Sequence, residues 1–354
     1  MNKILIILAL FLVLGIAMPA MATNNGMVYT ETNDATDNKI VVLERAADGS
    51  LTNSGMFATQ GSGTGSGLGN QGGVILTEDR NNLLAVNAGS NEISVFRVTS
   101  RGLKLTDKVN SGGIKPISIT VKDDLVYVLN AGGNGNIVGF NLDDGKLSMI
   151  PNSIRPLSSN SAGPAEISFN PDGKVLVVTE KLTNMIDSYT VNKKGIANGP
   201  TTRASNGPVP FGFAFDKRGH LIISEAPISA LSSYAVDDDG NLVNISISIP
   251  DFQAAACWVV VTENGKFAYT NNAGSDTISS YVISKTGVIS LLDSVAGTPG
   301  AGNIDLALSK NSKFLYSLNS IDHTIAGFRV NPDGSITLVG KIAVPTGADG
   351  LAAI

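Results

Sequence analysis

Side chains with oxygen donors recur at one position along the chain. Counting nine residues back from the aromatic residue of successive β-rich segments reaches Asn87, Glu180, Glu225, Asn272 and Asn319; Asn130 precedes its aromatic residue by ten, and Glu31 is the nearest equivalent close to the N-terminus. Carboxylate and amide oxygens suit a hard cation such as Ca²⁺, a cationic ligand, or the hydroxyl groups of a sugar-like molecule. Glu180 and Glu225 are also candidates for a general acid or base.

A second acidic set lies at or near the start of other predicted strands. It consists of Glu166, Asp305 and Asp349, with Gln71 at the equivalent place in one repeat. If both sets line one opening, they predict a mouth that binds a small polar molecule or Ca²⁺. An alternative explanation applies to the asparagines, because Asn at a strand end often stabilises the following turn through its side chain. It applies less to Glu180 and Glu225, since Glu is a poor turn former.

Several other motifs indicate no enzyme class. Residues 67–72 (GLGNQG) fit the G-x-G-x-x-G pattern, but they lead into a predicted strand at Val74 and open no helix that would bind a pyrophosphate. We expect a long flexible loop there. The chain contains no G-x-S-x-G nucleophile motif, and its single cysteine, Cys257, excludes an intramolecular disulfide. His323, beside Asp322 in a predicted loop, is either a base or an exposed loop residue.

The elements that must position these residues form a repeat of about 45 residues, the length of one four-stranded propeller blade. A turn with glycine marks each repeat, because glycine accepts the positive φ of a tight hairpin. The seven turns are Asp48-Gly49, Arg101-Gly102, Asp144-Gly145, Lys194-Gly195, Asp239-Gly240, Thr286-Gly287 and Asp333-Gly334. We place them between the third and fourth strands, C and D, of blades whose innermost strand is A.

A second set of polar turns precedes strands rich in β-forming residues, and we place these turns between strands A and B. The predicted B strands cover residues 83–86, 125–129, 175–179, 221–224, 267–270 and 314–318. The chain begins with B, C and D strands near residues 27–30, 40–44 and 51–58, and residues 347–354 resemble a lone A strand. The sequence therefore predicts an all-β, seven-bladed β-propeller of four-stranded antiparallel blades. The C-terminal strand completes the first blade and closes the ring, with no helix.

Composition limits the partners. Lys plus Arg number 25 against 30 Asp plus Glu, a formal net charge of −5, so nothing favours nucleic acid or an anionic membrane surface. The 39 glycines among 354 residues and a hydrophobic content of 43% indicate a turn-rich chain with a well-filled core. We expect one domain, a monomer, and a small polar molecule or a protein as partner.

The first residues have the pattern of a signal peptide. Lys3 precedes an apolar run at residues 4–17, and Ala20-Met21-Ala22 supplies small residues before a cleavage site. The run is too short to span a bilayer comfortably, so we predict no membrane span. Residues 1–22 are thus a predicted signal peptide cut after Ala22, and residues 23–354 a single domain that is secreted or periplasmic.

Three sequence phrases carry a resemblance to a known family. They are LAVNAGSN at residues 84–91, YVLNAG at 127–132 and GPAEISFNPDGK at 163–174. They resemble the lactonase-type seven-bladed propellers, which include propeller-class 6-phosphogluconolactonase and the fungal carboxymuconate lactonising enzyme. The resemblance covers essentially the whole predicted mature chain, and it is more specific for fold than for activity.

The resemblance implies a site of one His, two Arg and one Glu at the channel mouth. Glu180, in the phrase Val-Thr-Glu-Lys, matches the family Glu, but Ala165-Glu166 stands where the family has Arg-His. The second Arg falls near Ile304-Asp305, and the His-containing strand of an earlier blade reads Pro116-Ile117-Ser118. Loss of both arginines removes the natural donors to an anionic substrate and to a developing oxyanion.

Two function classes follow. The first is an exported binding or scaffold module that uses its channel mouth or face for a small polar ligand, a cation or a protein. The alternative is a lactone hydrolase or cycloisomerase of altered specificity, with Glu180 or Glu225 as general acid or base. Because an anionic lactone requires a basic mouth, Lys115, Lys181 or Arg203 folded over the channel would favour the enzyme.

Overall fold

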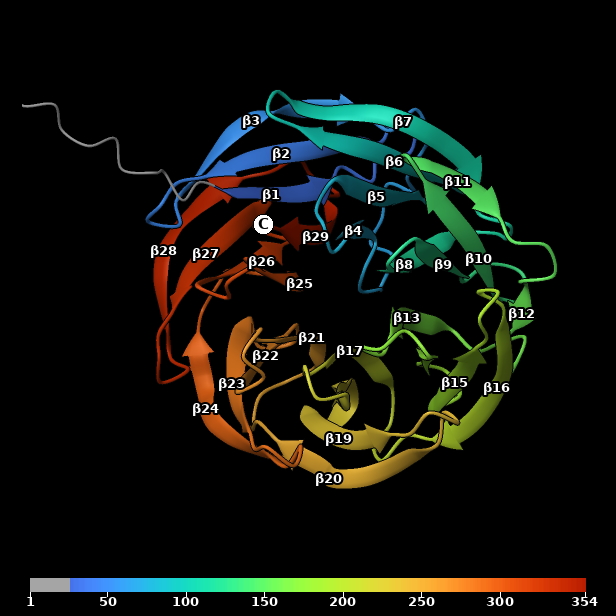
Figure 1. Ribbon diagram of the computed structural model, residues 1–354. Coiled ribbons are helices and arrows are strands. Elements are labelled where there is room, and N and C mark those ends of the chain that lie inside the picture. The colour runs from blue at the N-terminus through green and yellow to red at the C-terminus, as the bar shows by residue number, and fades with distance from the viewer. Residues whose placement is uncertain (1–25) are drawn as a thin grey trace, which may run out of the picture.

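The computed structural model describes residues 26–354, and the predicted signal peptide lies outside this range. The described chain forms seven antiparallel sheets arranged around a central axis, as Figure 1 shows. The predicted all-β, seven-bladed propeller is therefore confirmed. Among the described residues no helix is long and apolar enough to cross a membrane.

The first four blades follow the predicted strand order. Given from the innermost strand outward, blade 1 contains β29 (Asp349–Ala353), β1 (Gly26–Glu31), β2 (Lys39–Arg45) and β3 (Leu51–Ala58). Blade 2 contains β4 (Val74–Leu76), β5 (Asn82–Asn87), β6 (Glu92–Thr99) and β7 (Gly102–Asn110). Blade 3 contains β8 (Pro116–Lys122), β9 (Leu125–Asn130), β10 (Asn136–Asp143) and β11 (Lys146–Met149), with the short β12 (Arg155–Pro156) also paired to β10. Blade 4 contains β13 (Pro164–Phe169), β14 (Val175–Glu180), β15 (Met185–Val191) and β16 (Ala197–Ala204).

The last three blades repeat the same pattern. Blade 5 contains β17 (Pro210–Phe215), β18 (His220–Glu225), β19 (Ala230–Val236) and β20 (Leu242–Pro250). Blade 6 contains β21 (Ala256–Val261), β22 (Phe267–Asn272), β23 (Thr277–Ile283) and β24 (Ile289–Gly297). Blade 7 contains β25 (Asn303–Leu308), β26 (Phe314–Asn319), β27 (Thr324–Val330) and β28 (Ile336–Ala343). Within residues 26–354 the only helical element is a three-residue 3₁₀ turn at Ala226–Ile228, which follows β18 and has a proline in its first positions.

Closure of the ring brings the two ends of the domain into one sheet. Strand β29 pairs antiparallel with β1 through Val28↔Ala353, Tyr29↔Ala352 and Glu31↔Asp349. In Figure 1 the red β29 accordingly lies beside the blue β1. The predicted role of the C-terminal strand is confirmed, and pairing removes the open edge that β1 would otherwise present.

Burial explains why the strands differ in sequence. The B strands pack against neighbouring blades on both faces, so every residue of β5, β14, β22 and β26 is buried. The D strands face solvent on one side, and β28 accordingly contains only half-buried and exposed residues. Continuous apolar runs therefore identify B strands and mixed runs identify D strands.

The glycine turns also join neighbouring blades. Five of their glycine carbonyls accept a hydrogen bond from a hydroxyl group of the preceding blade. The pairs are Tyr316 Oη to Gly49 (3.1 Å), Tyr127 Oη to Gly195 (2.8 Å), Ser188 Oγ to Gly240 (2.7 Å), Ser233 Oγ to Gly287 (2.7 Å) and Tyr269 Oη to Gly334 (2.9 Å). The first pair crosses the closure between blade 7 and blade 1.

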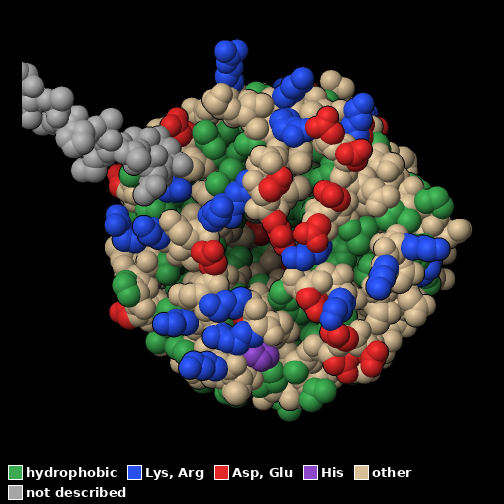
Figure 2. Space-filling view, in the orientation of Figure 1, with side chains coloured by type: hydrophobic (Ala, Val, Ile, Leu, Met, Phe, Trp, Pro, Cys, Tyr) green, Lys and Arg blue, Asp and Glu red, His purple; other side chains and the backbone are tan. Residues whose placement is uncertain are grey.

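The two ends of the channel differ in the connections that surround them. We call the side that bears the D–A and B–C connections the loop face, and the side that bears the A–B and C–D turns the turn face. Because successive strands are antiparallel, all connections of one kind emerge on the same side. Figure 2, drawn along the axis, shows a hollow at the centre of one face with acidic and basic side chains around it.

Candidate functional site

The recurrent polar residues form a regular ring below the loop face. Each of the seven is the last residue of its B strand: Glu31, Asn87, Asn130, Glu180, Glu225, Asn272 and Asn319. All seven are buried, with at most 1% of their surface exposed. The regular spacing is thus reproduced in space, but the side chains do not form an exposed mouth.

The amides of this ring hold the loops above them. Asn87 donates to Ser94 Oγ at 2.8 Å, and that hydroxyl donates to the carbonyl of Thr59 in the loop that follows β3. Asn319 donates to the carbonyl of Pro299, in the loop before β25. The turn-stabilising alternative for the asparagines therefore agrees with their hydrogen bonds.

Glycines of the same loops lie directly against the ring. A Cβ atom on Gly61 would lie 2.3 Å from Cγ of Asn87, and one on Gly113 would lie 2.5 Å from Cγ of Asn130. Only glycine leaves room for this close approach of loop to strand end. These recurrent loop glycines were a signal for the ring that the sequence analysis missed.

Glu180 is enclosed by donors of blade 4. Its carboxylate accepts hydrogen bonds from the Ser158 amide at 3.0 Å, from Ser158 Oγ at 2.5 Å and from Thr183 Oγ1 at 2.5 Å. A second buried carboxyl, Asp187 on β15, accepts from the same Ser158 amide at 2.8 Å. Burial and then the neighbouring Glu180 raise the pKa of Asp187 to about 7. The sequence analysis did not identify this carboxyl pair.

Glu225 has an equivalent environment in blade 5. It accepts hydrogen bonds from the Gly207 amide at 2.8 Å, from Ser232 Oγ at 2.6 Å and from Ser248 Oγ at 2.6 Å. Like Glu180, it links the loop before its own blade to the strands beside it. Catalytic roles for Glu180 and Glu225 remain predictions, and neither side chain is open to solvent.

A second acidic cluster lies closer to the axis. It contains Glu166, Asp305 and Asp349 from A strands and Glu31 from the first B strand. Shifts in strand register interrupt the pairing at the three A-strand residues, and such irregularities redirect side chains. All four carboxyls are buried. Repulsion between like charges links Glu31 with Asp349, Asp349 with Asp305, and Asp305 with Glu166.

Burial is the main cause of the pKa shifts in this inner cluster. It raises the pKa of Glu31, Glu166 and Asp305 well above their ordinary values, and that of Asp349 to about 6. The like charges named above add to the shifts of Glu31, Glu166 and Asp305. Each of these groups therefore loses its proton less readily than an ordinary exposed carboxyl does.

Residues 67–73, which we call the plug segment, cross the channel above this cluster. The amide of Leu68 donates to Asp349 Oδ2 at 3.0 Å in blade 1, and the amide of Gln71 donates to the carbonyl of Ala165 at 3.2 Å in blade 4. The indole of Trp258 in blade 6 donates to the carbonyl of Asn70 at 2.7 Å. The segment thus joins blade 2 to blades on the far side of the ring.

The side chain of Gln71 makes three hydrogen bonds to blades 5 and 6. Its Oε1 accepts from the amide of Val259 at 3.0 Å, and its Nε2 donates to the carbonyls of Val259 at 2.8 Å and Phe213 at 3.3 Å. Leu68, Asn70 and Gln71 are at most 9% exposed. The expectation of a flexible loop at residues 67–72 is therefore corrected, because these contacts anchor the segment inside the channel.

Lysines occupy the mouth beside the plug segment. Lys181 Nζ donates to the carbonyl of Gly69 and lies 5.0 Å from the centre of the Phe211 ring. Burial, with a smaller contribution from the positive charge of Lys115, lowers the pKa of Lys181 to about 8. The positive charge of Lys115 also partly offsets the rise in the pKa of Asp349. Arg203 instead bonds to Leu242 and Asn244 on the outer strand β20, so two of the three cations considered from the sequence lie near the channel.

The described residues were compared with the side-chain clusters that bind metal ions. Among residues 26–354, no group of three or more His, Cys, Asp or Glu side chains is arranged to hold a metal ion. The interpretation of the polar ring as a Ca²⁺ site remains a prediction.

A family model described as lactonase, seven-bladed β-propeller matches residues 21–156, 147–257 and 251–354. The chain belongs to this lactonase family. No curated protein sequence matches this lactonase-family propeller.

Solved structures share its fold at low sequence identity. A protein from Lactobacillus plantarum has a TM-score of 0.77 at 18% identity and covers 94% of this chain and 99% of its own. A putative 6-phosphogluconolactonase from Bacteroides fragilis has a TM-score of 0.76 at 16% identity, covering 95% and 99%. The periplasmic gluconolactonase PpgL of Pseudomonas aeruginosa has a TM-score of 0.77 at 15% identity, covering 94% and 99%. At these identities the likeness extends to fold alone.

The raised acid pKa values of this lactonase-family propeller predict how its stability depends on pH. The folded state retains protons on Asp349 and Asp187 that the unfolded chain releases above about pH 4, so stability falls as pH rises through about 6 and 7. We expect the free energy of unfolding to fall by about 4 kcal/mol between pH 5 and pH 8. Urea denaturation at both values measures this.

Two variants check the origin of the pH effect. Asp349→Asn removes a titrating group and should flatten the dependence, whereas Asp239→Asn, at an exposed turn, should leave it unchanged. Stability that rises from pH 5 to pH 8 would contradict the assignment.

Proposed function

We propose that this propeller is an exported binding module that docks a partner protein on its loop face. The plug segment carries the proposal, because it covers the channel where the family activity is expected. Its hydrogen bonds to five other blades occupy groups that a substrate would otherwise meet. The enclosed Glu180 and Glu225 support the same conclusion.

Exposed apolar side chains surround the plugged channel. Ile114 and Phe252 lie in D–A connections, and Leu182, Ile228 and Ile321 lie in B–C connections. Their exposed fractions are 55%, 77%, 74%, 46% and 69%, respectively. Large apolar side chains collected on one face are typical of protein-binding surfaces. A rim of this kind favours a protein over a small polar molecule as the partner.

Export is part of the proposal. The N-terminal pattern of Lys3, an apolar run and Ala20-Met21-Ala22 supports it. One similar structure, PpgL, is itself described as periplasmic.

The docking surface predicts a selective loss of binding. Replacing Leu182 and Phe252 together by lysine adds charge to two of the most exposed rim positions without touching the core. We expect capture of the partner from the exported fraction of source cells to fall at least about tenfold, the scale for losing anchors at an interface. Quantitative mass spectrometry of cross-linked complexes measures this.

Leu338→Lys is the matched control for that variant. Leu338 is 51% exposed on the outer strand β28, away from the mouth. A partner retained by the wild type and by Leu338→Lys but lost by the double variant supports docking on the loop face. A partner that binds all three proteins equally contradicts it.

Lactone hydrolysis is the second candidate, and the lysines at the mouth favour it. Lys181 and Lys115 lie where cations would attract an acidic lactone. If hydrolysis occurs, Glu180→Gln should reduce acid release about a hundredfold, the usual scale for loss of a general acid or base. Neutral lactones, acidic lactones and 6-phosphogluconolactone are assayed with and without Ca²⁺.

Glu263→Gln, at an exposed turn on the turn face, is the control for charge removal. Absence of acid release by the wild type agrees with the binding module. If the wild type releases acid at a high rate, and Glu180→Gln abolishes this activity while Glu263→Gln preserves it, the protein is a lactone hydrolase and the binding-module proposal is wrong.

A further inference from the structure

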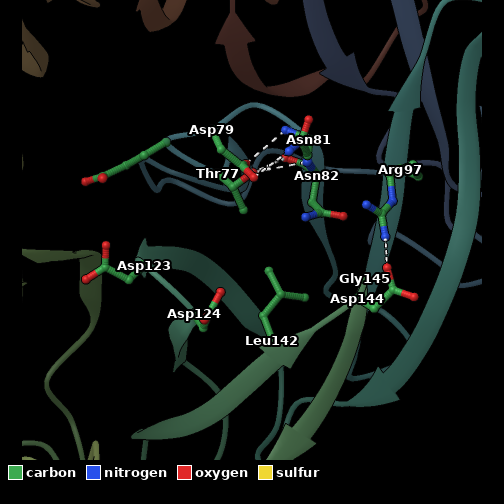
Figure 3. A pocket seen from close by; sticks show the side chains of 11 residues that line it. Thr77, Asp79, Asn81, Asn82, Arg97, Asp123, Asp124, Leu142, Asp144 and Gly145 are labelled. Atoms are coloured by element: carbon green, nitrogen blue, oxygen red, sulfur yellow. Dashed lines mark hydrogen bonds and ion pairs between the residues drawn. The ribbon is translucent and has the colours of Figure 1, made fainter.

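A separate cavity lies on the turn face, between blades 2 and 3. Its volume is about 610 Å³, and Figure 3 shows the side chains that line it. It is formed by the A–B turns of both blades and by the C–D turn of blade 3 at Asp144 and Gly145. The cavity is thus far in the fold from the loop face proposed for docking.

One buried side chain in this cavity has an unused acceptor. Asn82, the first residue of β5, is only 8% exposed. Its backbone is paired with Thr77, but no donor among residues 26–354 reaches its side-chain Oδ1. In Figure 3 its side chain extends into the cavity toward Leu142. A buried acceptor without a partner is costly, so it indicates a ligand that supplies a donor.

Negative charge surrounds this acceptor. Five carboxylates line the cavity, Glu78, Asp79, Asp123, Asp124 and Asp144, against one cation, Arg97. Arg97 is paired with Asp144 at 2.6 Å, and Glu78 is paired with Lys122 at 2.8 Å. Within residues 26–354, the carboxylates of Asp123 and Asp124 have neither an ion pair nor a hydrogen bond. The ligand should therefore be a cation.

The form of the cavity favours an extended organic cation. Its acceptors are spread along the walls, and Leu142, which is 5% exposed and part of the core, supplies an apolar surface between Asn82 and Asp124. Methylene groups pack on such a surface, while ammonium groups bond to carboxylate and amide oxygens.

We propose that this cavity binds a linear polyamine. One ammonium group donates to Asn82 Oδ1, a second pairs with Asp124 and Asp123, and the methylene chain lies over Leu142. This site is independent of the docking proposed for the loop face. Spermidine is the probe, because it joins three amines by flexible methylene chains.

Calorimetric titration of the full chain with spermidine tests the proposal. Asp124→Asn removes an ammonium partner and should raise Kd about tenfold, the scale of one charge-assisted hydrogen bond. Asn82→Leu should raise Kd similarly while melting at or above the wild-type temperature, because it removes a buried unpaired acceptor. Binding should weaken with added NaCl, since part of the attraction is electrostatic.

Asp239→Asn supplies the matched loss of one charge at an exposed turn outside the cavity and should change Kd less than twofold. If this control weakens binding as much as Asp124→Asn does, the attraction is diffuse and the site is refuted. Displacement of spermidine by an equal concentration of Ca²⁺ would also refute it, because the cavity would then be a metal site. Failure of spermidine to bind at millimolar concentration would refute it as well.

Discussion

Deletion of residues 347–354 should abolish the cooperatively folded state. The deletion removes β29, which pairs with β1 and buries Leu351 and Ala352, and it removes Asp349, which holds the amide of Leu68. The loss of edge hydrogen bonds, apolar burial and plug contacts together exceeds the roughly 5–15 kcal/mol that stabilises a typical domain. We expect insoluble protein, or soluble protein with no cooperative transition on heating.

A rearranged chain is the control for this deletion. Residues 347–354 are moved ahead of Gly26 through a short turn, which restores a regular A–B–C–D order to blade 1. Because Ala353 already pairs with Val28, this connection spans adjacent strand ends. The rearranged protein should fold, showing that the strand is needed wherever it is attached. A deletion variant that unfolds at the wild-type midpoint would contradict the role of β29.

Gln71→Ala should cause the second largest loss of stability. The substitution leaves the Val259 amide, the Val259 carbonyl and the Phe213 carbonyl without partners in a buried region. Each unpaired buried group costs about 1–3 kcal/mol, so we expect a total cost of about 3 kcal/mol after partial rearrangement. Denaturant unfolding with an unchanged slope and a lower midpoint would report it.

Two further variants test the plug segment. Gly212→Ala places a Cβ atom 2.2 Å from Gln71 Oε1 and 2.7 Å from the carbonyl of Cys257, so it should destabilise the protein in the same direction. Gln60→Ala, at an exposed position of the same loop, should change stability by less than about 0.5 kcal/mol. If Gln71→Ala matched Gln60→Ala, the plug segment would be held by other contacts.

The seven blades could be predicted because the signals that define them are local. Asp48-Gly49 and its equivalents specify hairpins through glycine at positive φ, and the observed B strand Val175–Glu180 extends the predicted residues 175–179 by one residue. Closure by residues 347–354 followed from counting strands, because the first blade lacks an A strand of its own and the C-terminal segment supplies an extra one. The even spacing of the ring from Glu31 to Asn319 followed from the same repeat.

The architecture of the protein, the position of the polar ring at the strand ends and the family to which the repeat belongs all follow from the sequence. The contacts of those polar groups depend on the tertiary structure. Gln71 and Val259 are 188 residues apart, and no local pattern links them. Glu180 meets Ser158 and the buried Asp187 because strand pairing and loop packing bring them together. Turn residues and the alternation of apolar and polar residues determine structure over a few positions of the chain. Burial and hydrogen bonding across the channel instead depend on closure of the whole ring.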